Sequence, residues 1–454
     1  MTAHSGVDAA SLRGDRCRFS VVGAYWLIQG SNAAQWIVYS PIVRQVESYY
    51  NVGSTEVNLL SSMYMICYVI FVFFSAVVFD VVGLKRGVLL ASLLNLLAAV
   101  IRLVSLYIYP SYGLLIVTQF VAAFAQILLL PSPPYIANQW FAATQRTAAN
   151  TVLFSATGAG TALGLLIPPL IVRNSEKHEF AMLFLGHVFF AAAGVLWAAL
   201  GFPMQPSIPP SFAANHDAVA DRQRSIRAVT FDVFRSMYRI ALDQYQLILS
   251  GGCAVGLSWS IAAVLPQLLE PFGVSERWSG VIGFANMGAG TLVAPFIGHL
   301  LDRSRTFHKP ILLMLMGMLL CLAVLPSVLC LHYSLDTPAV LAVTFVTWTG
   351  AGILQTAMLP AMFELMVELT FPVPESISAP ALLWMASFLS LVFIYVFGAI
   401  LGDHPGKGES LWCLGGSVLV TGCAVAFAAY VVPVYKRQEF ERKQLVQDYS
   451  EVNL

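Results

Sequence analysis

Twelve long apolar stretches constrain this chain more than any other feature of its sequence. A hydrocarbon core of about 30 Å needs about 20 helical residues to cross it. The predicted spans are residues 19–43, 57–80, 87–109, 112–134, 148–172, 181–202, 243–268, 278–301, 310–333, 338–362, 378–401 and 410–433. Only helices and closed barrels satisfy the backbone in lipid, and these continuous runs lack the alternating pattern of barrel strands. We therefore expect an all-α membrane protein with twelve transmembrane helices.

The charge content narrows the function classes. Only 11% of the residues are charged, and the formal net charge is zero, so a nucleic-acid partner has no electrostatic support. No embedded nucleophile with a base and no metal constellation is visible, so we do not expect an enzyme. The expected partners are the lipid bilayer and a small-molecule substrate, with no cofactor, and the expected state is a monomer.

The positions of lysine and arginine predict the orientation. Basic residues concentrate on the side of the two termini, which the positive-inside rule assigns to the cytosol. The predicted cytosolic set is Arg13, Arg16, Arg18, Lys85, Arg86, Arg146, Arg222, Arg224, Arg227, Arg235, Arg239, Arg303, Arg305, Lys309, Lys436, Arg437, Arg442 and Lys443. The opposite set is only Arg44, Arg173, Lys177, Arg277 and Lys407. The plasma membrane is the expected location, and an endolysosomal membrane is the alternative.

The longest connection divides the chain into two halves. The expected organisation is a cytosolic tail at 1–18, a six-helix bundle at 19–202, a cytosolic linker with an amphipathic segment at 203–242, a second six-helix bundle at 243–433 and a cytosolic tail at 434–454. Trp36 precedes Asp80 by 44 residues, and Trp259 precedes Asp302 by 43. This repeated spacing predicts pseudo-symmetric bundles, between which transporters place a substrate site.

The polar residues expected at mid-membrane depth are amides and tryptophans rather than acids. They are Asn32, Gln35, Trp36, Gln126 and Trp259. Every Asp and Glu falls in a loop or near a helix end, which weighs against a proton symporter coupled through a carboxylate. Tryptophan faces with neutral amides suit a poorly solvated cation or a flat aromatic molecule.

Charged motifs lie at the predicted cytosolic helix ends. The segment from Asp80 to Lys85 and Arg86, and the segment with Asp302 and Arg303, resemble the inter-helix loop signature of the major facilitator superfamily. That resemblance implies a major facilitator fold and a charged latch between the bundles. Glu364 and Glu368 are four residues apart, so they share one helix face; their predicted role is a gate, with a fixed ion-pair network as the alternative.

Longer motifs resemble the heme and choline transporter family related to the feline leukaemia virus subgroup C receptor. They are residues 32–40, 62–68, 80–85, 125–126, 140–141, 166–169 and 363–372, the last resembling the family's FExxVExxYP signature. The resemblance implies a substrate cage that includes Trp36, Gln126 and, where choline carriers usually have tyrosine, Trp259. The family's glutamine on helix eleven maps near Ser387, which has a shorter side chain. The tryptophan at the helix seven position is similar to the lysosomal branch, for which a vitamin B6 substrate is implied.

Two functions follow as hypotheses. The first is a facilitator that moves heme or another porphyrin, a choline-like amine, or a vitamin by alternating access. The alternative is a nontransporting receptor or sensor that retains the transporter fold.

Overall fold

The computed structural model describes most of the predicted membrane region. The described residues are 17–142, 145–204, 206, 235–240, 242–304, 306–331, 337–373, 375–402, 405–440 and 442. Most of the predicted linker and of both tails therefore lies outside them. Within the linker, residues 235–240 are helical and Tyr238 is exposed.

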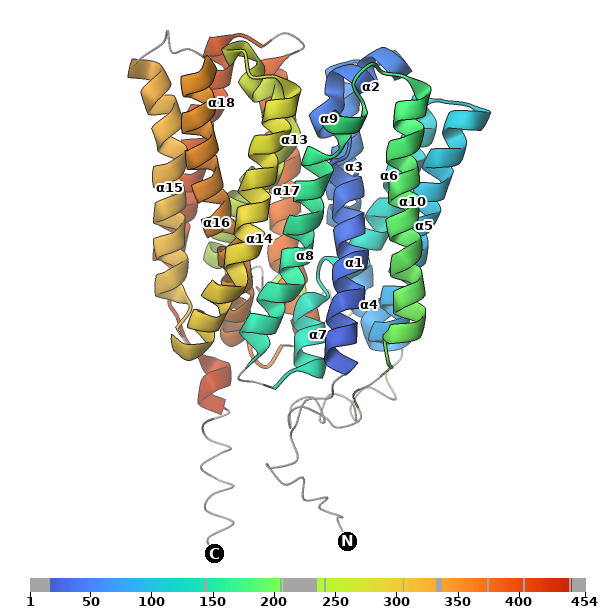
Figure 1. The fold of residues 1–454 in the computed structure, drawn as a ribbon. Coiled ribbons are helices and arrows are strands. Elements are labelled where there is room, and N and C mark those ends of the chain that lie inside the picture. The colour runs from blue at the N-terminus through green and yellow to red at the C-terminus, as the bar shows by residue number, and fades with distance from the viewer. Residues whose placement is uncertain are drawn as a thin grey trace, which may run out of the picture.

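The first half of the chain forms the N-terminal bundle, which is coloured blue to green in Figure 1. Its elements are α1 (Cys17–Ile37), η2 (Ser40–Ile42), α2 (Val43–Tyr50), α3 (Ser54–Phe71), α4 (Phe73–Val82), α5 (Leu84–Ile108), α6 (Tyr112–Leu129), α7 (Pro133–Trp140), α8 (Arg146–Leu166), α9 (Pro168–Ile171) and α10 (Lys177–Gly201).

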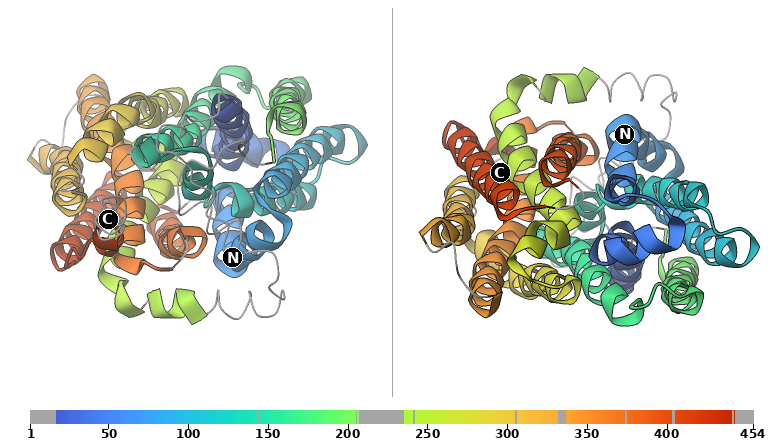
Figure 2. Two further views of the ribbon diagram at one scale, coloured as in Figure 1. Left: turned by 90° about the horizontal axis from the view of Figure 1, so that it is seen from below. Right: turned by 90° about the horizontal axis from the view of Figure 1, so that it is seen from above.

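The second half forms the C-terminal bundle, coloured yellow to red. Its elements are α13 (Tyr245–Leu269), η5 (Glu270–Phe272), α14 (Glu276–Ser304), α15 (His308–Leu331), α16 (Thr337–Thr370), α17 (Glu375–Leu401) and α18 (Lys407–Ala429). The two bundles stand side by side, and the end-on views in Figure 2 show them as separate groups of helices. We call the end at which α1 begins and α18 ends the terminal end, and the opposite end, where α2 and α9 lie, the distal end.

The twelve predicted spans correspond to twelve long helical segments among the described residues, but not all of them are simple. Ten are apolar and long enough to cross a membrane, and α3 with α4 makes an eleventh that bends by 66°. At the bend, the backbone N–H and the hydroxyl of Ser75 both donate to the carbonyl of Val72, an i−3 bond of the 3₁₀ type. Helix α1 falls outside the apolar set, because it carries fully buried polar side chains at Gln29, Asn32 and Gln35.

The packing of the helices repeats between the halves. In the N-terminal bundle, α1 packs on α8 and α10, α5 packs on α6 and α10, and α3 packs on α6. In the C-terminal bundle the equivalent pairs recur, because α13 packs on α17 and α18, α15 on α16 and α18, and α14 on α16. The bundles join through two equivalent contacts, α8 with α14 and α3 with α17. The pseudo-symmetry predicted from the tryptophan and aspartate spacing is thus present throughout the packing.

Candidate functional site

Trp36 and Trp259 meet at the interface between the bundles. Each lies on the first helix of its bundle, α1 or α13, and their ring centroids are 6.3 Å apart at an interplanar angle of 70°. Both side chains are buried, and the Trp36 indole N–H donates to the carbonyl of Ser61 on α3 at 3.1 Å. Edge-to-face contact is an arrangement that aromatic pairs prefer. The structure therefore brings together the two tryptophans that the sequence repeat singled out.

Gln126 and Ser387 are the other predicted cage residues. Gln126 lies on α6 and Ser387 on α17, and both are buried. Trp384, one turn before Ser387, donates its indole N–H to the carbonyl of Val69 at 2.9 Å. This part of α17 therefore lies against α3 of the N-terminal bundle.

Several hydroxyls in the core that contains Trp36 and Trp259 have spare hydrogen-bonding capacity. Tyr64 and Tyr68 belong to that core, and their hydroxyls have no hydrogen-bond partner among the described residues. The same holds for the Ser387 hydroxyl. Because a buried unpaired hydroxyl costs about 1–3 kcal/mol, such groups gain from a polar ligand or water.

Asn32 and Gln35, also predicted at the site, take part in an amide network inside the N-terminal bundle. The Asn32 amide donates to Asn95 Oδ1 at 3.0 Å and to the carbonyl of Ala122 at 2.9 Å. Gln35 donates to the same Asn95 oxygen at 2.9 Å. These bonds hold α1 against α5 and α6, and they explain why a membrane helix tolerates so many amides.

A second polar cluster, which the sequence did not predict, surrounds a buried arginine. Arg102 on α5 donates to Gln119 on α6 at 2.7 Å and lies 3.3 Å from His187 Nδ1 on α10. The guanidinium also stacks over the rings of Tyr39 and Phe184, with centroid distances of 5.4 and 5.7 Å. Cation–π contacts of this kind stabilise a desolvated charge by about 0.5–2 kcal/mol. The partners come from α6, from α10 and from the turn after α1, which are far apart in the chain, so no local sequence pattern predicts the cluster.

The bundles are also in contact at the terminal end. Phe154 on α8 stacks on Phe363 on α16 with centroids 4.7 Å apart, and Asn150 donates to Glu364 Oε1 at 2.7 Å. Glu368, one turn further along α16, accepts the backbone N–H of Gln438 at 3.1 Å. Of the two predicted gate residues, Glu364 is thus bonded across the interface, whereas Glu368 is bonded to the segment after α18.

The predicted latch is only partly described. The side chains of Asp80 and Asp302 lie outside the described part of the structure, and Arg86 and Arg303 are exposed. Lys85 is partly exposed. Gly83 joins α4 to α5 at a φ of +87°, a conformation that side chains with a Cβ rarely adopt. The backbone conformation between α4 and α5 therefore explains why this position of the motif is glycine. The charged latch stays a prediction.

At the distal end an ionic cluster bridges the bundles. Arg44 on α2 donates to both carboxylate oxygens of Glu270, at 2.9 and 3.1 Å, and lies 3.3 Å from Glu47. Its backbone N–H donates to Glu276 at 3.3 Å. Burial lowers the pKa of Arg44, but hydrogen bonds and charges from Glu270 and Glu47 raise the pKa above its usual value overall. The guanidinium therefore stays charged at any physiological pH.

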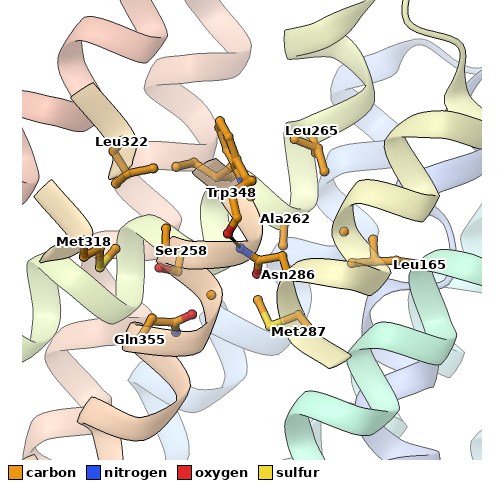
Figure 3. Close-up of a pocket in the computed structure, with 14 residues that line it drawn as sticks. Leu165, Ser258, Ala262, Leu265, Asn286, Met287, Met318, Leu322, Trp348 and Gln355 are labelled. Carbon is orange, nitrogen blue, oxygen red and sulfur yellow. Dashed lines mark hydrogen bonds between the residues drawn. The ribbon is translucent and has the colours of Figure 1, made fainter. Parts of the chain in front are cut away.

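Neither tryptophan is part of the lining of two cavities in the described structure. One has a volume of about 20 Å³ and lies beside Ser258, Asn286 and Gln355 of the C-terminal bundle, with Leu165 of α8 also in its lining (Figure 3). The Asn286 amide there donates to the carbonyl of Trp348 at 2.6 Å. This space suits about one water molecule and no organic substrate. The other cavity, about 180 Å³, is lined by the distal ionic cluster, and we call it the distal cavity.

The fold and the interface define a class of protein, a multi-pass membrane protein of two related six-helix bundles that meet around an aromatic centre. Residues 25–375 match the Major Facilitator Superfamily. The chain belongs to that family and is a transporter of the major facilitator fold.

Comparison with curated proteins adds more specific relatives. The chain is 27% identical to the choline/ethanolamine transporter FLVCR2 of Homo sapiens over 448 residues, covering 96% of this chain and 81% of the relative. It is also 27% identical to the choline/ethanolamine transporter FLVCR1 of Felis catus over 407 residues, covering 87% and 70%.

Solved structures agree on the fold. A D-xylose-proton symporter matches with a TM-score of 0.66 at 14% identity, covering 92% of this chain and 98% of that one. The Escherichia coli fucose:proton symporter FucP matches with a TM-score of 0.61 at 13% identity, covering 91% and 99%. At these identities the likeness concerns the fold alone.

Proposed function

We propose that this protein is a facilitator that moves a small organic ammonium ion, of the choline and ethanolamine class, across a membrane by alternating access. The observation that carries the proposal is the contact between Trp36 and Trp259 across the bundle interface. Each bundle contributes one indole, so a substrate held between the two rings binds both bundles at once. Separation of the bundles at either end would then open the same site to one side of the membrane.

The chemistry of the proposed cage fits such a cation. Indole faces attract a poorly solvated ammonium through the ring quadrupole, typically by about 0.5–2 kcal/mol. The amide of Gln126 and the hydroxyl of Ser387 are neutral groups that can bond the substrate hydroxyl or amine. Both curated relatives carry choline and ethanolamine in their names, which supports the same substrate class.

Vitamin B6 is the second candidate, because the chain departs from the choline pattern at two cage positions. The second indole at Trp259 offers a larger flat surface than tyrosine. Ser387 leaves more room than glutamine. Both changes favour a planar ring over a compact cation. Heme, which the resemblance also raised, belongs in the same assay.

The proposal includes an orientation and a setting. The excess of lysine and arginine at the terminal end supports cytosolic termini. We propose the plasma membrane as the location, with an endolysosomal membrane as the alternative. We further propose that the protein acts as a monomer, without a cofactor and without nucleic acid.

Transport in cells tests the substrate and the cage together. Cells expressing the wild type should take up or release labelled choline or ethanolamine faster than control cells, and Trp36→Ala should lose most of that flux. Pyridoxine and heme are measured in parallel, and pyridoxine flux without choline flux would select the second candidate. Trp412→Ala is the matched control, because that indole is 77% exposed on α18. Undiminished flux in Trp36→Ala would rule out the cage.

A further inference from the structure

The distal cavity carries an excess of negative charge. Its lining includes the carboxylates of Glu47, Glu270 and Glu276 against a single guanidinium, Arg44. The neighbouring Arg277 is exposed and is not part of the lining. With three carboxylates facing one cation, the electrostatic potential in the cavity favours a further positive charge.

The cavity has room for a small organic ion. Its volume of about 180 Å³ is more than ten times the roughly 10–15 Å³ that one water molecule needs. It also spans the interface, since Arg44 and Glu47 belong to the N-terminal bundle and Glu270 and Glu276 to the C-terminal bundle. A ligand there would contact both halves of the protein.

A buried amide in the lining independently indicates a missing polar partner. Gln267, on the last turn of α13, is only 7% exposed, and its Nε2 has no hydrogen-bond partner among the described residues. Its Oε1 accepts a bond of 3.4 Å from Asn58 on α3. An unpaired buried N–H group of this kind costs about 1–3 kcal/mol, and a ligand hydroxyl in the cavity would satisfy it.

We propose that the distal cavity is a second binding site for small organic ammonium ions, in which the ligand competes with the Arg44 guanidinium for the carboxylate of Glu270 and with the Arg44 backbone N–H for the carboxylate of Glu276. The proposal rests on the ammonium substrate proposed above. The ligand's cationic head lies among the carboxylates, and its hydroxyl accepts the Gln267 amide N–H. Because the Arg44 bonds to Glu270 and Glu276 cross the interface, ligand binding weakens a contact that holds the distal end closed. Binding of a substrate at this site would thus also weaken the contacts that hold the bundles together at the distal end.

Equilibrium binding of labelled choline to the purified full-length protein tests this site, with tetramethylammonium as a competitor that lacks the hydroxyl. The wild type should bind choline at two sites, and Trp36→Ala should retain only the distal one. Binding at that remaining site should weaken as salt is raised, because exposed charges are screened. In the Trp36→Ala background, Glu276→Gln should weaken distal binding by about tenfold or more, the usual effect of losing a charged partner.

The opposite substitution makes the test specific. Arg44→Gln should tighten choline binding at the distal site, because it removes the competing cation, whereas damage to the fold would not tighten binding. Glu176→Gln is the matched control, since it removes an exposed charge at the same end. A single site that depends on Trp36, with no residual binding in Trp36→Ala, would overturn the distal site and leave the proposed function intact. Absence of all ammonium binding in the wild type would overturn both.

Discussion

Trp36 and Trp259 illustrate what single residues reveal in a repeated fold. Their matching distances from Asp80 and Asp302 predicted equivalent places in two halves, and equivalent residues can meet only where they lie close to the pseudo-symmetry axis. The 6.3 Å contact follows from that geometry. Arg102 and His187 had no such signal, because 85 residues separate them and neither repeats in the other half. Their contact depends on the packing of α5 against α10.

Ser387 supports a prediction about substrate choice. Ser387→Gln lengthens the side chain at the position where choline carriers resembling this chain have a glutamine. It should tighten choline binding several-fold, because an amide reaches further than the hydroxyl. Ser387→Ala should instead weaken choline binding by about two- to tenfold, because it removes the unpaired hydroxyl that is proposed to bond the substrate. Competition binding with labelled choline measures both. Unchanged choline affinity in both variants would place this residue outside the cage.

At the scale of helices, hydropathy predicted the spans well and their interruptions poorly. The ends of α5, α10 and α13 lie within a few residues of the predicted spans 87–109, 181–202 and 243–268. The first predicted span, 19–43, is instead a helix that stops at Ile37, followed by η2. Hydropathy alone cannot reveal this break, because the residues on both sides of it are apolar enough for the hydrocarbon core. The bend at Val72 also lies within a continuously apolar stretch, so hydropathy does not reveal it.

Close helix packing gives a prediction at this scale. Gly160 on α8 faces the backbone of Gly30 on α1, and a Cβ added there would overlap that backbone. Gly160→Ala should therefore push α8 from α1 and lower stability by about 1–3 kcal/mol, as overpacking usually does. Gly186→Ala is the matched control, because a Cβ there meets nothing within 4 Å; it should be neutral or slightly stabilising. Thermal unfolding of the purified variants measures the difference, and an equal effect of the two would contradict the packing.

For the whole molecule, the sequence predicted two bundles but not how they are closed. The bundles touch at the terminal end through Phe154 and Phe363, at the centre through the tryptophans, and at the distal end through Arg44 and Glu270. All of these partners lie more than 200 residues apart in the chain, and only the tryptophans are related by a repeated spacing. A substrate between the tryptophans can leave only if one end opens. Transport through this site therefore requires the bundles to move relative to each other.

Counterflow in reconstituted vesicles tests that requirement most directly. Vesicles that contain the purified protein and are loaded with unlabelled choline should transiently accumulate labelled choline from outside. The accumulation should saturate with choline concentration and be lost in Trp36→Ala, while Trp412→Ala behaves as the wild type. The contradicting result is a wild-type protein that binds choline with a Trp36-dependent affinity yet gives no counterflow of any tested substrate. That outcome would make the protein a receptor that retains the transporter fold.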